Sequence, residues 1–123
     1  MKVVNLAEKF SRFTDYCNPR IVGEVNDLHV KVVKLKGEFL WHHHENEDEL
    51  FLVTRGTLRI QYREGGEERE VKVGPGEFVV VTKGTEHRPI GDDEVHIVLF
   101  EPKSTLNTGN VVNERTVAQL QKI

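Results

Sequence analysis

Short runs in which apolar and polar residues alternate occupy the chain from Leu28 to Pro102. In residues 28–37, β-branched valines stand among polar neighbours, which is typical of a strand on a half-buried sheet. Glycine, proline or an acidic turn bounds nearly every later run. We expect further strands within residues 38–44, 48–56, 56–66, 67–76, 77–84, 86–93 and 94–102. This regular spacing of strands and turns predicts an all-β sandwich or barrel.

The two ends of the chain break this pattern. Residues 5–13 predict a short helix, because Asn5 can cap it and its apolar residues share one face. Residues 17–27 are expected to form a loop or an edge strand. After Pro102 the sequence is loop-like, and residues 113–123 allow a short final helix. We therefore expect a single domain over residues 1–123, with short helical or loop extensions around a barrel core at about 28–101.

Composition narrows the classes of function. Hydrophobic residues make up 37% and charged residues 30% of the chain, as in soluble globular proteins. The formal net charge of −3 argues against a general nucleic-acid binder, which usually carries a basic face. The single cysteine excludes an intramolecular disulfide, and no apolar run approaches the ~20 residues of a membrane helix. We expect a cytoplasmic protein without membrane or nucleic-acid partners.

The densest chemical signal is the run HHHENEDE, which begins at His42. If this stretch starts as a strand, successive side chains alternate between its faces. His42 and His44 then share one face, and His43 lies on the other with Phe39 and Trp41. Two residues along a strand span about 6.6 Å, so two imidazoles at this spacing can converge on one metal ion.

A second predicted strand follows the acidic turn. Glu49, Phe51 and Val53 share one of its faces, and Leu50 and Leu52 share the other. Glu49 can therefore enter the interior beside the two histidines. Its carboxylate would supply a hard anionic ligand and cancel one unit of a metal ion's charge.

A fourth candidate ligand, His87, follows a glycine-bounded apolar strand, but nothing local ties it to the first cluster. Together the two segments resemble the paired motifs of small single-domain cupins. The first motif is matched by Gly37, His42, His44, Glu49 and Gly56, and the second by Gly76, residues 82–84 and His87. The resemblance covers about residues 28–101.

This resemblance implies a double-stranded β-helix, or jelly roll, that holds one divalent metal ion inside the barrel. The implied metal ligands are His42, His44, Glu49 and His87. Three positions depart from the pattern without being ligands: Gly37 lies one residue closer to the first histidine, Thr82 replaces a proline, and Gly91 replaces an asparagine. The chain most resembles small cupins described as mannose-6-phosphate-isomerase-like.

Three imidazole nitrogens and one carboxylate leave a divalent ion with a net charge near +1. An octahedral ion would keep two positions for water, substrate or dioxygen, which suits iron or manganese, and nickel or cobalt would also bind. A tetrahedral zinc ion would be closed by the same four ligands, and its role would then be structural.

Other polar residues have less specific patterns. His43 is expected to have a structural or interface role, and His29 a structural one. Either face of the strand that carries His96 could be the interior, so a role near the pocket stays open. Arg59 and Gln61 lie on the solvent face if their apolar neighbours face the core, and contact substrate if they do not. Residues 64–70 predict an exposed hairpin tip, and Cys17 predicts simple packing.

Two functions follow from this site. The first is a metal-dependent enzyme, of isomerase or dioxygenase type, that acts on a small oxygen-rich molecule. The second is a binding module that holds a metal and a small ligand without turnover. No catalytic residue beyond the ligands is indicated. The resemblance also implies a homodimer, for which the outward apolar residues Phe39, Trp41, Leu50 and Leu52 are candidates.

Overall fold

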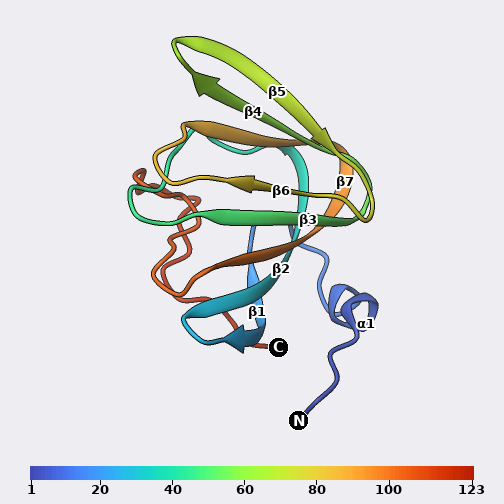
Figure 1. Cartoon of the computed structure of the whole chain (residues 1–123). Helices are drawn as coiled ribbons and strands as arrows, with labels where there is room; N and C mark the ends of the chain where they lie inside the picture. The colour runs from blue at the N-terminus through green and yellow to red at the C-terminus, as the bar shows by residue number, and fades with distance from the viewer.

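The computed structural model describes residues 1–123 and contains one short helix and seven strands (Figure 1). The helix α1 spans Leu6–Phe10. The strands are β1 (Arg20–Val25), β2 (Leu28–Glu38), β3 (Glu49–Arg55), β4 (Leu58–Glu64), β5 (Glu67–Val73), β6 (Phe78–Val81) and β7 (His87–Pro102). All strand pairs are antiparallel. None of the helical structure is long and apolar enough to cross a membrane.

The strands form a jelly-roll barrel, as the sequence predicts, and the long strand β7 pairs with β2, β3 and β4 in its wall. Five strands lie in the order β1-β2-β7-β3-β6, while β4 pairs with both β5 and β7. The first residues of β7, 87–90, pair with β4, and residues 90–102 pair with β2. β7 therefore runs from the β4–β5 hairpin at the top of Figure 1 to the side that carries β1.

Alternation along β2 and β7 sends their side chains to two separate apolar clusters. Inside the barrel, Val33 and Ile97 belong to a cluster of 11 buried residues. On the outer face, Val32 and Val98 pack against Phe10 of α1. The outer cluster thus fixes the helix to the sheet, and the inner cluster forms the wall of the site described below.

The predicted strands at 86–93 and 94–102 are a single strand, and Gly91 explains how the chain bends there. Gly91 pairs with Gly37 at an irregularity in the β2–β7 register. A Cβ atom at Gly91 would lie 2.9 Å from the carbonyl oxygens of Leu35 and Asp93. Only glycine allows this close approach, so its replacement of the motif's asparagine is a packing requirement of this chain.

The predicted strand within residues 38–44 is wrong, since β2 ends at Glu38 and only His42 makes an isolated β-bridge beyond it. The N-terminal helix is confirmed but shorter than predicted, and the Asn5 side chain caps it by accepting a hydrogen bond from the Glu8 N–H at 3.0 Å. Residues 17–27 contain the predicted edge strand, β1.

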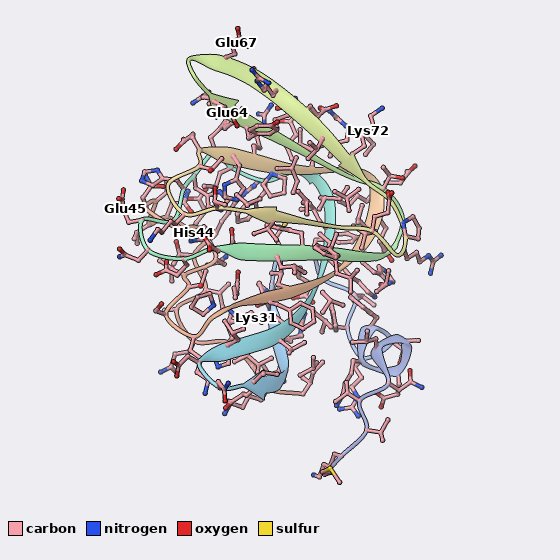
Figure 2. The ribbon with its side chains drawn as sticks, in the orientation of Figure 1. Lys31, His44, Glu45, Glu64, Glu67 and Lys72 are labelled. Carbon is pink, nitrogen blue, oxygen red and sulfur yellow. The ribbon has the colours of Figure 1, made fainter.

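The final residues form no helix, because their backbone pairs with β1 instead. Ile21 donates to the Gln121 carbonyl at 2.9 Å and accepts from the Ile123 N–H at 3.0 Å. At the opposite end of the barrel, Gly65 and Gly66 turn the β4–β5 hairpin with positive φ angles of 59° and 80°. Figure 2 shows the charged side chains of this hairpin pointing into solvent, as predicted.

Replacing Phe10 by Ala tests the outer cluster. The side chain is 4% exposed and stacks on the His96 ring, with centroids 4.6 Å apart. We expect the F10A variant to lose about 3–5 kcal/mol of unfolding free energy, because the cavity left under α1 cannot fully collapse.

Urea unfolding followed by circular dichroism measures this loss. Val112→Ala is the matched control, since that side chain is 79% exposed and its truncation should change stability by less than about 0.5 kcal/mol. Equal midpoints for the two variants would contradict the proposed role of α1.

Candidate metal centre

A backbone bridge brings the two distant histidine segments together. His42 donates its N–H to the His87 carbonyl at 3.0 Å, and His87 donates to the His42 carbonyl at 2.9 Å. This pairing also keeps the segment after β2 extended although it is not part of a regular strand. His42 and His44 therefore both face inward, as alternation predicts, and His87 joins them from the start of β7.

All four predicted ligand residues meet inside the barrel. His42, His44, Glu49 and His87 are between 0% and 5% exposed. One potential ligand atom from each lies within 4.8 Å of the corresponding atom of every other residue. The sequence prediction that these four side chains converge is thus supported by the structure, while their coordination of a metal stays a prediction.

The buried atoms of this cluster lack hydrogen-bond partners. His44 Nε2, His87 Nε2 and Glu49 Oε1 are all buried and make no hydrogen bond. Glu49 Oε1 lies 2.9 Å from His44 Nε2 and 3.3 Å from His87 Nε2, so the atoms are close without being aligned as donors and acceptors. Buried polar atoms are rarely left unpaired, and a divalent cation at their common focus would satisfy all of them.

Backbone carbonyls orient two of the rings. The Nδ1–H of His42 can donate to the Leu40 carbonyl at 3.0 Å, and that of His87 to the Thr85 carbonyl at 2.8 Å. These contacts place the protons on Nδ1 and leave Nε2 as the free lone pair that faces inward. This is the usual way in which proteins fix the tautomer of a metal-binding histidine.

The protonation states also suit a cation. Burial, followed by repulsion from His87, lowers the pKa of His42 to about 4, so its ring is neutral at neutral pH. Burial would raise the pKa of Glu49, but interactions with Glu101, His44 and His87 outweigh burial and hold this pKa well below its usual range. His42 therefore offers a neutral nitrogen, and Glu49 offers an ionised carboxylate.

The sequence predictions do not include the buried ion pair that lies beside the cluster. Lys31 Nζ donates to Glu101 Oε1 at 2.6 Å, and both side chains are 2% exposed. When no cation balances Glu49, burial together with the Glu49 carboxylate raises the pKa of Glu101 well above its usual range. A divalent cation bound at the cluster would oppose this rise and favour the ionised form of Glu101. Alternation along β7 could have predicted that Glu101 is buried, because it follows Ile97 and Leu99 on the inward face of the strand.

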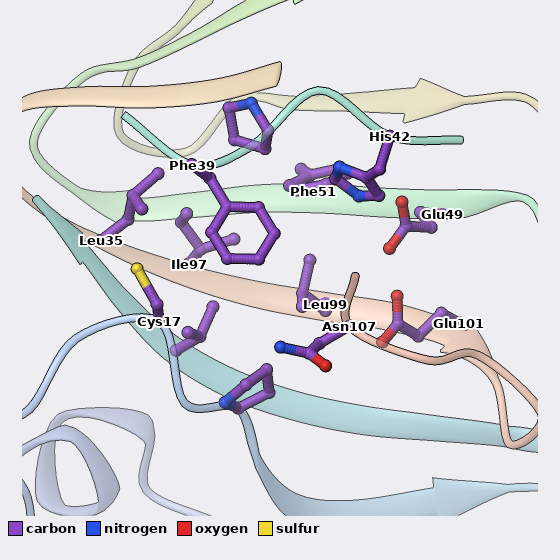
Figure 3. A pocket seen from close by; sticks show the side chains of 13 residues that line it. Cys17, Leu35, Phe39, His42, Glu49, Phe51, Ile97, Leu99, Glu101 and Asn107 are labelled. Carbon is purple, nitrogen blue, oxygen red and sulfur yellow. The ribbon is translucent and has the colours of Figure 1, made fainter. Parts of the chain in front are cut away.

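A cavity of about 60 Å³ opens beside the cluster (Figure 3). His42 and Glu49 form part of its wall, so the candidate metal site has an open side. Phe39 also lines the cavity and packs edge-on against His42, with centroids 5.5 Å apart. The prediction that Phe39 faces outward is therefore wrong, because the chain leaves the strand geometry after Glu38.

His43 has a structural role, which is one of the two roles that the sequence predicts for it. Its side chain contacts Glu45 and lies 3.0 Å from Glu86, and these two hydrogen bonds raise its pKa. Its backbone holds the C-terminal segment by exchanging hydrogen bonds with Asn110 at 2.9 and 3.0 Å. Gly109 (φ 57°) allows this contact, since a Cβ there would lie 2.2 Å from the His43 carbonyl oxygen.

The remaining candidates lie away from the cluster. His96 is on the outer face, stacked on Phe10 and 2.7 Å from Glu94, so it does not line the cavity. Arg59 pairs with acidic neighbours outside the barrel while Leu58 and Ile60 are buried, which confirms the solvent-face interpretation. Gln61 accepts a hydrogen bond from Arg88 on the outside of the barrel. His29 is half-buried near Glu24, and Cys17 lines the far end of the cavity.

The model of the Cupin domain family matches residues 29–101. This chain belongs to the Cupin domain family. A cupin-2 domain containing protein from Shewanella frigidimarina NCIMB 400 is 40% identical, with a TM-score of 0.77, and the match covers 82% of this chain and 95% of that one.

Two further relatives are more distant. The uncharacterized protein YdbB of Bacillus subtilis (strain 168) is 36% identical over 67 residues, which make up 54% of this cupin and 57% of YdbB. The chain thus matches little more than half the length of that relative. Hydroquinone 1,2-dioxygenase from Sphingomonas sp. TTNP3, solved with 4-hydroxybenzoate bound, has a TM-score of 0.74 at 19% identity, over 84% of this chain and 32% of that enzyme. That likeness is one of fold alone.

Replacing His42 and Glu49 together by Ala tests the ligand assignment. The double variant removes two of the four converging donors, so we expect a cupin that binds about one metal ion per chain to lose nearly all of it. Elemental analysis after loading with metal and dialysis without chelator measures the metal content.

His43→Ala and His29→Ala are the matched controls, since both rings lie outside the cluster and these variants should keep their metal. Unchanged metal content in the double variant would show that the ligands are other residues.

Proposed function

We propose that this cupin is a metal-dependent enzyme that acts on a small oxygen-containing molecule bound inside the barrel. The observation that carries the proposal is that two of the four converging residues, His42 and Glu49, also line a cavity. A purely structural site would be enclosed by its ligands, whereas catalytic sites keep an open position. An octahedral iron, manganese, nickel or cobalt ion would meet this requirement better than tetrahedral zinc.

The protein's own contribution is orientation and exclusion of water. Carbonyl groups hold the Nε2 atoms of His42 and His87 in position, and Glu49 provides one negative charge. Apolar side chains such as Phe51 and Leu99 surround the open side and keep its dielectric low, which strengthens electrostatic interactions with a bound molecule. A metal ion, when bound, would supply a Lewis acid or, if it is iron, an oxygen-activating centre.

The fold shared with hydroquinone 1,2-dioxygenase supports testing oxygen chemistry first, and sugar isomerisation second. A non-catalytic binding module is the second candidate. One observation favours it: beyond the metal-binding candidates, the cavity wall offers only Glu101, which is held by Lys31, and the Cys17 thiol at the far end as acids or bases.

Metal removal tests the enzyme proposal. We expect the protein purified without chelator to contain a redox-active metal ion or one with an open coordination position. Its activity should disappear after chelation and return when that metal is restored. Elemental analysis, an oxygen electrode and a sugar-isomerisation screen supply the three measurements. The H42A/E49A double variant should be inactive in both assays. Stoichiometric zinc with no turnover in either screen would favour the binding module.

We also propose a homodimer, with its interface on the outer face of β3 and β6 rather than at Phe39 or Trp41. Phe39 faces the cavity, and Trp41 is covered by Arg63, whose guanidinium lies 4.0 Å from the ring centroid. On β6, by contrast, Phe78 is 61% exposed and Val80 is 46% exposed, and β6 pairs only with β3. Exposed apolar residues on an edge strand are a typical site of association.

A charge at this edge should prevent association. We expect Phe78→Glu to convert a dimer to a monomer, because a carboxylate would be buried without a partner. Size-exclusion chromatography with light scattering measures the mass. Val112→Glu, at an exposed position in the C-terminal segment, serves as the control. Dimers of unchanged stability in the F78E variant would place the interface elsewhere.

A further inference from the structure

The cavity beside the candidate metal centre is divided into a polar end and an apolar body. Figure 3 shows His42, Glu49 and Glu101 gathered at one end, with Leu35 and Cys17 at the other. The wall between them is almost entirely apolar, made by Val33, Phe39, Phe51, Ile97, Leu99 and two prolines. A molecule in this cavity therefore has one polar end and an apolar remainder.

Once the metal cluster is set aside, Glu101 supplies the polar atom at this end that is left for a ligand. Asn107 also lines the cavity, but the C-terminal segment holds its amide: one N–H donates to the Arg115 carbonyl at 2.8 Å, and the amide oxygen accepts from the Val117 N–H at 2.9 Å. Glu101 Oε2, in contrast, is buried and has no hydrogen-bond partner.

Lys31 fixes Glu101 in this position without filling the cavity. Its ammonium binds Oε1, the other oxygen of the Glu101 carboxylate, at 2.6 Å. Lys31 is not part of the cavity wall, so its charge balances that of Glu101 from behind. The pair thus presents a held carboxylate oxygen next to Glu49, on the open side of the candidate metal site (Figure 3).

We propose that the cavity binds an uncharged, mainly apolar molecule with a hydroxyl group at one end, and that Glu101 is the residue that selects this group by hydrogen-bonding it. A hydroxyl suits the position because its lone pairs can face a cation while its proton faces Glu101. The inference rests on the proposed function, since it names the substrate class of the same site.

This class excludes the phosphorylated sugars that the mannose-6-phosphate-isomerase-like resemblance suggests. The cavity wall contains two carboxylates and no lysine or arginine to bind a phosphate group. A sugar would also leave several hydroxyl groups buried against Leu35, Phe39 and Ile97 without partners. Such a site selects a ligand whose single polar group finds a hydrogen-bond partner in the cavity wall. It rejects ligands with further polar groups that would be buried without partners.

Four probes separate these features. Phenol has an apolar ring and one hydroxyl, toluene lacks the hydroxyl, benzoate replaces it with a charged group, and mannose 6-phosphate is a charged polyol. Protein loaded with cadmium, a diamagnetic ion that accepts more than four ligands, is titrated with each probe, and nitrogen-15 NMR shifts of the Cys17 and Phe39 amides report binding in the cavity. We expect phenol to bind at least about tenfold more tightly than toluene, and benzoate and mannose 6-phosphate not to bind there.

The variant Glu101→Gln tests the assigned residue. It should remove most of the phenol-over-toluene preference while leaving toluene affinity and metal content unchanged, a selective loss that a general structural defect would not produce. Asp93→Asn, an exposed carboxylate on the same strand, should keep the full preference. Where the single variant does not fold, Lys31→Met with Glu101→Met removes the ion pair without leaving a lone buried charge, and the same loss of preference is expected.

Alkylation of Cys17, the chain's only cysteine, shows whether the probe binds inside the cavity. Bound phenol should slow alkylation of this thiol, because it lines the apolar end of the cavity. Equal loss of phenol and toluene affinity in E101Q, or tighter binding of benzoate or mannose 6-phosphate than of phenol, would overturn the inference. Absence of binding by every probe to metal-containing protein would overturn it too, without touching the metal assignment, whereas protein that takes up no metal would refute the proposed function itself.

Discussion

Three ring nitrogens and one carboxylate oxygen converge inside a largely apolar barrel, and the arrangement of the whole site depends on their burial. Each unpaired buried polar group costs about 1–3 kcal/mol. His44 Nε2, His87 Nε2 and Glu49 Oε1 all lie in this situation. The rings of His42 and His87 cannot turn away to find other partners, because carbonyl groups hold them from behind. A cation bound at this point would pair these atoms and remove that cost.

The Lys31–Glu101 pair extends the same constraint. A second carboxylate close to Glu49 would be strongly unfavourable in the interior unless a cation balanced it, and Lys31 supplies that balance at 2.6 Å. With a divalent ion, the four charged groups around the cavity sum to a net charge near +1, as they would without the pair. The pair therefore adds a hydrogen-bonding oxygen to the site without changing its net charge.

Local alternation explains which parts of the site could be predicted from the sequence. It placed His42, His44 and Glu49 on the interior because a strand or an extended segment leaves a side chain only two directions. His87 required a contact between segments far apart in the chain, which alternation does not supply and the cupin resemblance did. Phe39 was misplaced because β2 ends at Glu38, and the alternation that holds from His42 onward does not extend back across that break.

Alternate residues of the long strand β7 pack on opposite faces of the sheet, so a substitution on one face leaves the packing on the other face in place. On β7, Ile97, Leu99 and Glu101 point into the barrel, while His96 and Val98 pack outside beneath α1. The outer cluster supplies apolar burial that is independent of the cavity, so the interior can hold polar and unpaired groups that a single small core would not tolerate. Function and stability are thereby carried by neighbouring residues of the same strand, one position apart. The period of two that predicts the metal cluster also gives β7 a second, outer face, and the packing on that face does not depend on the cavity.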